Sequence, residues 1–97
     1  MVRYLVLLNF TEQGTKNIGE TLSRSESFQK AAQKGGASIK AQYWTVGGFD
    51  GALVLEAPDE ATAAGLLAKL GTAGNVRTQT LRAFDRSEME GVLGKMR

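Results

Sequence analysis

The stretch Tyr4–Phe10 is apolar at nearly every position, and this feature constrains the fold more than any other. It is too short and too continuously apolar for an amphipathic helix, in which apolar residues recur every three or four positions. The stretch therefore predicts a β-strand. Since neighbouring side chains of a strand point to opposite faces of a sheet, its even-numbered residues lie on one face, and Leu5 and Leu7 lie on the other. Both faces of this strand need an apolar cover.

Three further stretches have the patterns of strands. Apolar and polar residues alternate over Ser38–Val46, and Ala52–Ala57 is an apolar run. The glycine-rich segment Gly47–Gly51 between them predicts a tight antiparallel hairpin. The last stretch, Val76–Phe84, alternates again and predicts a fourth strand.

Helix signals lie between and after these strands. The capping-box motif Ser23-Arg24-Ser25-Glu26 predicts the start of a helix that ends at Gly35. Asp59 is suited to cap a second helix, in which leucines recur at helical spacing as far as Gly71. A second motif, Ser87-Glu88-Met89-Glu90, predicts a short C-terminal helix. The resulting order, β-α-β-β-α-β and then α, predicts an α+β fold of the ferredoxin-like kind, with a four-stranded antiparallel sheet and two helices on one face.

The amino-acid composition excludes several classes of function. The 97 residues, which we expect to form one domain over 1–97, include no Cys and no His, and so lack a thiol nucleophile, an imidazole base and the usual zinc or haem ligands. We therefore expect no cofactor. The formal net charge is only +2, and the run Ala52–Leu55 lacks the stacking aromatics of an RNA-recognition strand, which argues against nucleic acid as a partner. No apolar run approaches the ~20 residues of a membrane span or continues into a signal-peptide cleavage site, so we expect a cytoplasmic protein.

The second face of the predicted sheet indicates self-association. Ala52–Ala57 repeats the two-sided apolarity of Tyr4–Phe10, and two helices cover only one face of such a sheet. An uncovered apolar face of this size exceeds what soluble monomers usually carry. The simplest cover is a second copy packed sheet to sheet in a homodimer or higher homo-oligomer. The alternative is that the C-terminal helix folds over the open face of its own chain.

Three blocks of the sequence carry a resemblance to a known family. They read YWTVGGFDG over 43–51, EAPD over 56–59 and GNVRTQTLRAF over 74–84. Together they resemble the GYD-domain family. The resemblance implies a dimeric α+β barrel built from ferredoxin-like domains, and it implies no established biochemical function. Phe49 stands where the family has tyrosine, so this chain keeps the ring and lacks any hydroxyl chemistry at that position.

Five residues are candidates for ligand binding: Asn9, Tyr43, Trp44, Asp50 and Arg77. Tyr43 and Trp44 are neighbours on one strand and point to opposite faces, and each either orients a planar ligand or packs in the core. Arg77 follows a Gly-Asn turn, where it either binds an anion or forms an ion pair at a solvated edge. Asn9 is either a hydrogen-bonded buried amide or a pocket contact.

Asp50 separates the functional hypotheses. As a turn residue it holds the hairpin through a bond from its side chain to the backbone, whereas at the rim of a cavity it accepts a hydrogen bond or a proton. The leading hypothesis is a homo-oligomeric domain that binds a small, largely apolar or aromatic compound carrying an anionic or polar group, between the sheet and the helices. One alternative is a cofactor-free enzyme of isomerase or oxygenase type, with Asp50 as proton acceptor and Arg77 or a tyrosine stabilising the developing negative charge. The other is a structural assembly subunit with a filled interior.

Overall fold

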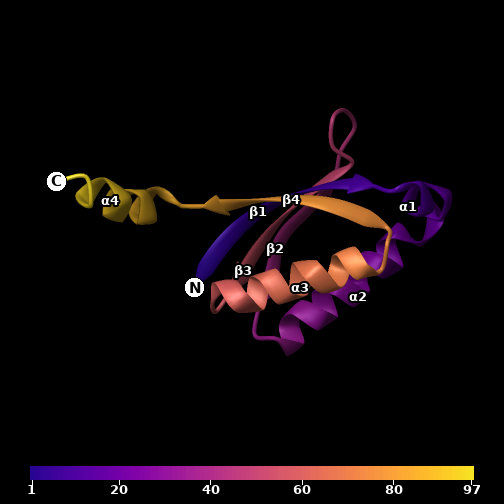
Figure 1. Ribbon diagram of the computed structural model, residues 1–97, viewed down its shortest axis with the longest axis horizontal. Helices are drawn as coiled ribbons and strands as arrows, with labels where there is room; N and C mark the ends of the chain where they lie inside the picture. Colours follow the sequence, from indigo (N-terminus) through magenta and orange to yellow (C-terminus); the bar gives the residue numbers. More distant parts are fainter.

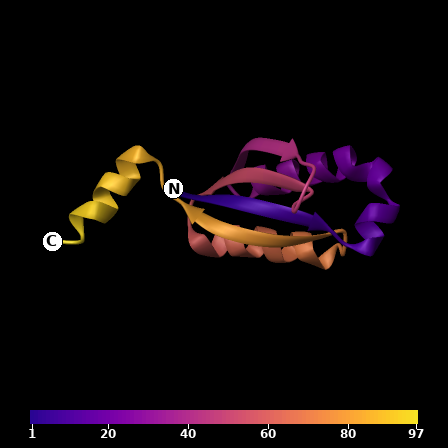
Figure 2. The same ribbon diagram turned by 90° about the horizontal axis from the view of Figure 1, so that it is seen from above.

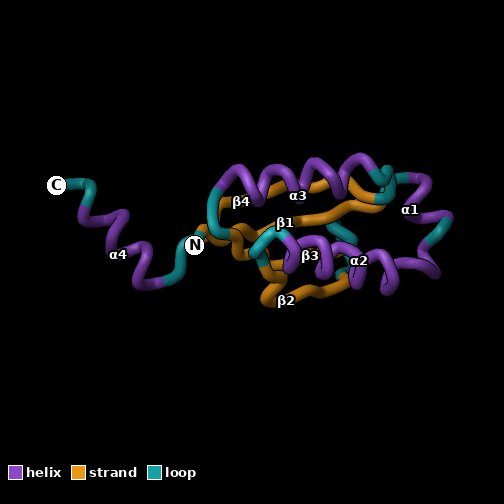
Figure 3. The backbone as a smooth tube through the Cα atoms, turned by 90° about the horizontal axis from the view of Figure 1, so that it is seen from below, coloured by secondary structure: helices purple, strands orange, loops and turns teal.

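The computed structural model describes residues 1–97 as a layer of helices packed on a four-stranded sheet (Figure 1). All neighbouring strands are antiparallel, in the order β2-β3-β1-β4. The strands are β1 (Val2–Phe10), β2 (Ser38–Trp44), β3 (Gly51–Ala57) and β4 (Val76–Ala83). Two helices cover one face, with α2 (Thr21–Lys34) over the β2 side of the sheet and α3 (Glu60–Thr72) over the β4 side (Figure 3). The predicted ferredoxin-like α+β fold is confirmed.

The hydrophobic core lies between the sheet and these two helices. In β1 the even-numbered Val6 and Leu8 are buried, and they pair with Leu53 and Gly51 of β3. Because side chains alternate along a strand, every second residue of β3 reaches the same core. The buried apolar residues are Val6, Leu8, Phe28, Ala32, Ala37, Leu53, Leu55, Ala57 and Ala63.

The other face of the sheet, which we call the open face, has no helix over it (Figure 2). Leu5 and Leu7 lie there, as the alternation of β1 predicts, and they pair with Val54 and Ala52 of β3. The register adds the following residues to this face: Arg3, Asn9, Ala41, Tyr43, Glu56, Arg77, Gln79, Leu81 and Ala83. The turn that joins β2 to β3 rises on the same side of the sheet, away from α2 and α3 (Figure 1).

The C-terminal helix α4 (Arg86–Gly94) extends beyond the end of β4 and away from the rest of the chain (Figures 1 and 2). It does not fold over the open face of its own chain. The intramolecular cover considered from the sequence is therefore absent from the structure, and the open face keeps its apolar surface.

Two polar elements connect β1 to α2. They are α1 (Glu12–Lys16) and the 3₁₀-helix η1 (Ile18–Glu20). The Thr11 hydroxyl oxygen caps α1 by accepting the Gly14 amide at 3.1 Å, and the same hydroxyl donates to the Gly74 carbonyl at 2.5 Å. The Thr11 amide donates to the Asn75 carbonyl at 3.0 Å. These bonds tie α1 to the loop that precedes β4.

Both predicted capping boxes were wrong in position. α2 begins at Thr21, and the Ser23 hydroxyl donates to the Glu20 carbonyl instead of capping a free amide. The reason is that η1 leads directly into α2, so the chain is already helical at Ser23, whereas a capping residue needs extended backbone. At the C-terminal helix the box is formed by Asp85 and Glu88, two residues before the predicted one.

The cap of α3 was predicted correctly. The Asp59 carboxylate accepts the Thr62 amide at 2.7 Å, and this hydrogen bond lowers the pKa of Asp59. α3 ends at Thr72, one residue beyond Gly71. None of the helices is long and apolar enough to cross a lipid bilayer.

Candidate functional site

A cavity of about 310 Å³ lies between α2, α3 and the sheet. Its walls are apolar: Phe28 and Ala31 come from α2, Leu66 and Leu70 from α3, and Leu53 from β3. The helix residues among them belong to the apolar faces that α2 and α3 turn toward the sheet. The same sequence pattern therefore forms both the core and the cavity wall.

The distribution of small residues explains where the cavity opens. Ala32, Ala37, Ala57 and Ala63 are all buried, and they lie where α2 ends and α3 begins. Methyl side chains let helices approach a sheet closely, so this end of the space between the layers is filled. The cavity occupies the other end, where α2 begins, α3 ends and β1 reaches Phe10.

Polar side chains surround the mouth of the cavity. Thr21, Ser23, Ser25, Gln42 and Asn75 contribute neutral groups. Ser25 and Gln42 are already joined, because the serine hydroxyl donates to the Gln42 Oε1 at 2.7 Å. The mouth therefore offers several hydrogen-bonding groups around an apolar interior, as small-molecule sites commonly do.

Two basic residues border the cavity, and only one of them is free. Arg24 donates from Nη1 to the Asn17 carbonyl at 2.8 Å and from Nη2 to the Gly14 carbonyl at 3.4 Å, so it holds the α1–η1 segment in place. The Lys69 ammonium makes no ion pair and no hydrogen bond to a side chain or carbonyl. Lys69 also borders an adjoining hollow with Lys30 and Lys34, which likewise lack acidic partners. The rim between α2 and α3 is thus positively charged.

Three of the five residues singled out in the sequence border this cavity. Trp44 and Asp50 do so from the ends of β2 and the following turn, and Tyr43 does so beside Trp44 although the register places its ring on the open face. The register confirms that the two rings point to opposite faces, since Tyr43 lies opposite Ala52 and Trp44 opposite Gly51. The Trp44 Nε1 donates to the Thr21 hydroxyl at 3.0 Å, which joins β2 to the start of α2 at the mouth.

Asp50 is held by hydrogen bonds at the end of β1. Its Oδ2 accepts the Phe10 amide at 2.8 Å, its own amide donates to the Leu8 carbonyl at 2.8 Å, and its carbonyl accepts the Thr45 amide at 3.0 Å. The side chain therefore makes the backbone contact expected of a turn residue, here across to a neighbouring strand.

Asn9 and Arg77 lie elsewhere. They are direct partners across the β1–β4 pair, on the open face, so a whole sheet layer separates their side chains from the cavity. The five candidates thus do not form one site: Trp44 and Asp50 lie at the cavity, Asn9 and Arg77 lie on the open face, and Tyr43 borders the cavity from β2 while its ring lies on the open face.

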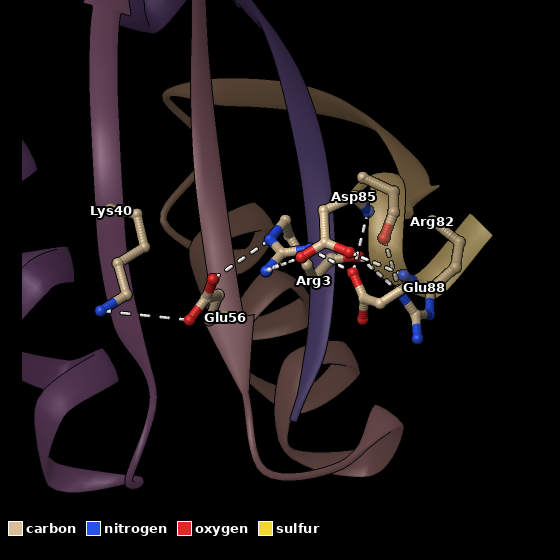
Figure 4. A network of polar contacts seen from close by, with 7 residues as sticks. Arg3, Lys40, Glu56, Arg82, Asp85 and Glu88 are labelled. Carbon is tan, nitrogen blue, oxygen red and sulfur yellow. Dashed lines mark hydrogen bonds and ion pairs between the residues drawn. The ribbon is translucent and has the colours of Figure 1, made fainter. Parts of the chain in front are cut away.

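A cluster of charged residues joins α4 to the sheet, and no sequence pattern indicated it (Figure 4). Arg3 donates from Nε to Glu56 Oε2 at 3.1 Å and from Nη1 to Glu88, and its Nη2 lies 3.6 Å from Asp85 Oδ2. Lys40 extends the cluster to β2, with its Nζ 4.0 Å from Glu56 Oε1. The hydrogen bond that Arg3 donates to Glu88 raises the pKa of Arg3. The pKa of Glu88 is lowered, first by the Asp85 amide and then by Arg3.

Arg82 supports the same cluster from β4. Its Nη1 donates to the carbonyls of Arg3 at 3.1 Å and Ala83 at 2.7 Å. Its guanidinium carbon lies 4.7 Å from the centre of the Phe84 ring and 5.7 Å from that of Tyr4, within the range of cation–π attraction. No group of three or more Asp or Glu side chains is placed to hold a metal ion.

Comparison with known proteins identifies the family. A protein from Thermus thermophilus, the glutamine synthetase and cystathionine beta-lyase binding protein, is 31% identical over 90 residues, which is 92% of this chain and 95% of that protein. The crystal structure of TTHA0845, also from Thermus thermophilus, matches with a TM-score of 0.54 and 20% identity over 88% of this chain and 95% of that one, which shows a common fold. The GYD domain model matches residues 4–93. Because that match spans nearly the whole sequence, the chain belongs to the GYD-domain family.

Proposed function

We propose that this chain is a non-catalytic binding domain whose cavity takes a small apolar or aromatic compound carrying an anionic group. The observation that carries the proposal is the cavity itself, about 310 Å³ with apolar walls and a polar mouth. Small-molecule sites in proteins measure roughly 300–1,000 Å³ and combine apolar walls with a few polar groups. A cavity at the lower end of that range suits a compound of one or two rings.

The charge around the mouth supports an anionic group on the ligand. Lys69 borders the cavity and has no acidic partner, so a carboxylate or sulfonate bound there would supply one. Lys30 and Lys34 add positive potential along the same rim. The apolar part of the ligand would lie against Phe28 and Leu66, where it removes apolar surface from water.

Two observations favour a binding domain over the alternatives. The Asp50 carboxylate accepts the Phe10 amide at 2.8 Å, which supports a structural role for it over that of a proton acceptor. The presence of a cavity argues against a subunit whose interior is filled by its own side chains. As part of the proposal, the domain acts as a homodimer, because the open face carries Leu5, Leu7 and Leu81 with no helix over them.

A second candidate function is the binding of a partner enzyme. It is favoured by the Thermus thermophilus relative, whose name describes it as binding glutamine synthetase and cystathionine beta-lyase and which aligns with 92% of this chain. Immobilised chain and purified glutamine synthetase would test it by surface plasmon resonance. Saturable binding would support this function, and its absence at micromolar enzyme would count against it.

The cavity is tested with dansylate (5-dimethylaminonaphthalene-1-sulfonate), a fluorescent aromatic anion of two rings. The protein should bind one molecule per chain. Ala31→Phe fills the cavity and should abolish this binding, whereas Ala68→Phe, on the exposed side of α3, should not. Lys69→Glu should weaken binding more than Lys95→Glu, which makes the same charge change at the end of α4. Unchanged affinity in the Ala31→Phe variant would show that the dye binds outside the cavity and would refute the proposed site.

A further inference from the structure

α4 is an arm whose first turn is joined to the sheet. Its first turn is closed by the capping box of Asp85 and Glu88, in which the Asp85 carboxylate accepts the Glu88 amide at 2.8 Å and the Glu88 carboxylate accepts the Asp85 amide at 2.9 Å. Arg3 of β1 then contacts both carboxylates from the sheet (Figure 4). The helix is therefore anchored at its base while the remainder extends into solvent (Figure 1).

The exposed part of this arm carries an apolar stripe without a partner. Met89, Val92, Leu93 and Met96 recur at the spacing of one helix face. Their exposed fractions are 43%, 38%, 51% and 79%, and no hydrogen bond or ion pair beyond the first turn joins α4 to the body of the chain. A helix of 9 residues is too short to be stable in water by itself, since isolated helices below about 12–15 residues are marginal. Packing of the stripe against another surface is what such a helix requires.

The open face provides such a surface, and its area indicates that a second copy of the chain can cover it. Four strands of about eight residues, spaced about 4.8 Å apart with about 3.3 Å per residue, cover a flat area of roughly 500 Å², and the accessible area is larger because side chains stand out from the sheet. Stable interfaces bury about 800 Å² on each partner. Two open faces packed together are therefore of the size that a stable dimer needs, and the apolar stripe of α4 adds further surface at their edge.

We propose that α4 is exchanged between two copies of this chain, so that the apolar stripe of each arm packs against the edge of the other copy's open face. This inference rests on the homodimer of the proposed function and adds the contact that completes it. The occupant is a second copy because the anchor, Arg3, lies on the open face itself, paired there with Glu56. The arm thus leaves the chain at the border of the surface that the second copy covers. A reciprocal exchange is two-fold symmetric and closes on itself, whereas a one-way contact would form filaments.

The exchange can be observed directly by nuclear magnetic resonance. The chain has three methionines, of which Met89 and Met96 belong to the stripe. Chains labelled with carbon-13 at the methionine methyl groups are mixed with unlabelled chains, and an isotope-filtered experiment records contacts between unlike copies. We expect contacts from both stripe methyl groups to protons of the unlabelled chain. A homodimer whose stripe methyl groups show contacts only within their own chain would overturn the exchange.

A matched pair of charge substitutions tests the energetics. Leu93→Asp places a carboxylate in the stripe, and Gly91→Asp places the same charge on the opposite side of α4, where nothing lies within 4 Å. Sedimentation velocity should show the dimer dissociation constant raised about tenfold or more by Leu93→Asp and little changed by Gly91→Asp. A wild-type dimer that Leu93→Asp leaves intact would overturn the exchange and keep the homodimer. A monomeric wild type would overturn both, while leaving dye binding in the cavity as a separate result.

Discussion

Replacing Gly14 with alanine is expected to destabilise the protein, although alanine is the better helix former. Gly14 is the buried residue of α1, and a Cβ built on it would lie 2.0 Å from the backbone oxygen of Asn75. Real Cβ atoms do not approach closer than 3.0 Å, so α1 and the loop before β4 must separate by about 1 Å. The atom in the way is main chain, and no rotation of a side chain can relieve the overlap.

The expected loss follows from the contacts that this movement disturbs. The bonds from the Thr11 amide to the Asn75 carbonyl and from the Thr11 hydroxyl to the Gly74 carbonyl each contribute about 1 kcal/mol. Residual overpacking costs about 1–3 kcal/mol. The better helix propensity of alanine returns about 1 kcal/mol. The free energy of unfolding should therefore fall by about 2–4 kcal/mol, which lowers Tm by about 10–20 °C in a domain of this size.

Thermal unfolding followed by circular dichroism measures this loss, with Gly65→Ala as the control. Gly65 lies in α3, where an added Cβ would meet no neighbouring atom within 4 Å, so alanine there should raise stability by about 0.5–1 kcal/mol. The same substitution thus has opposite signs at the two positions. A Gly14→Ala variant as stable as the wild type would refute the close approach of α1 to Asn75.

Three further predictions concern Asp50, Asp59 and Glu88. Asp50→Ala removes the acceptor of the Phe10 amide and should lower the free energy of unfolding, measured with denaturant, by about 1–2 kcal/mol. Asp50→Asn keeps an acceptor oxygen and should lower it less. Equal losses in the two variants would contradict this role of Asp50. The Thr62 amide lowers the pKa of Asp59, so the stabilising effect of the Asp59 carboxylate is present above the ordinary carboxyl pKa and is lost as pH falls through the lowered value. Asp59→Ala should therefore lower Tm at neutral pH and have little effect in strong acid. The pKa of Glu88 is also lowered, so the protection of α4 amides against exchange, corrected for the slower intrinsic exchange in acid, should decrease as pH falls through that value. Glu88→Gln should produce the same loss of protection at neutral pH, and unchanged protection in mass-spectrometric exchange would refute the anchoring role.

The order of the elements could be predicted because each has a strong local pattern. The apolar run of β1, the alternation of β2 and the glycine-rich turn at Gly47–Gly51 each favour one structure at the level of a few residues. Helix starts were less certain, because Asp85-Arg86-Ser87-Glu88 and Ser87-Glu88-Met89-Glu90 satisfy the same capping rule. Only the three-dimensional structure, in which Arg3 contacts Asp85 and Glu88, distinguishes them.

The candidate site was harder to predict because it is made of residues distant in sequence. Trp44 and Asp50 were found from the hairpin block, whose aromatic and acidic residues are conspicuous locally. Lys69 has no such signal: it is one lysine on an exposed helix face, and its relation to the cavity depends on how α3 lies beside α2. Arg77 was placed beside a turn correctly, but the pairing of β4 with β1 puts it on the open face with Asn9.

The two proposed surfaces lie at opposite ends and on opposite faces of one sheet, and this makes them separable. The cavity reaches Phe10 at the end of β1, whereas the anchor of α4 is Arg3 at its start. Roughly seven residues of strand span about 23 Å, well beyond the roughly 10 Å within which substitutions usually interact. Ala31→Phe should therefore remove dye binding without changing the dimer dissociation constant, and Leu93→Asp should do the reverse. If either variant changed both properties, the sheet would couple ligand binding to self-association, and the two surfaces would have to be treated as a single site.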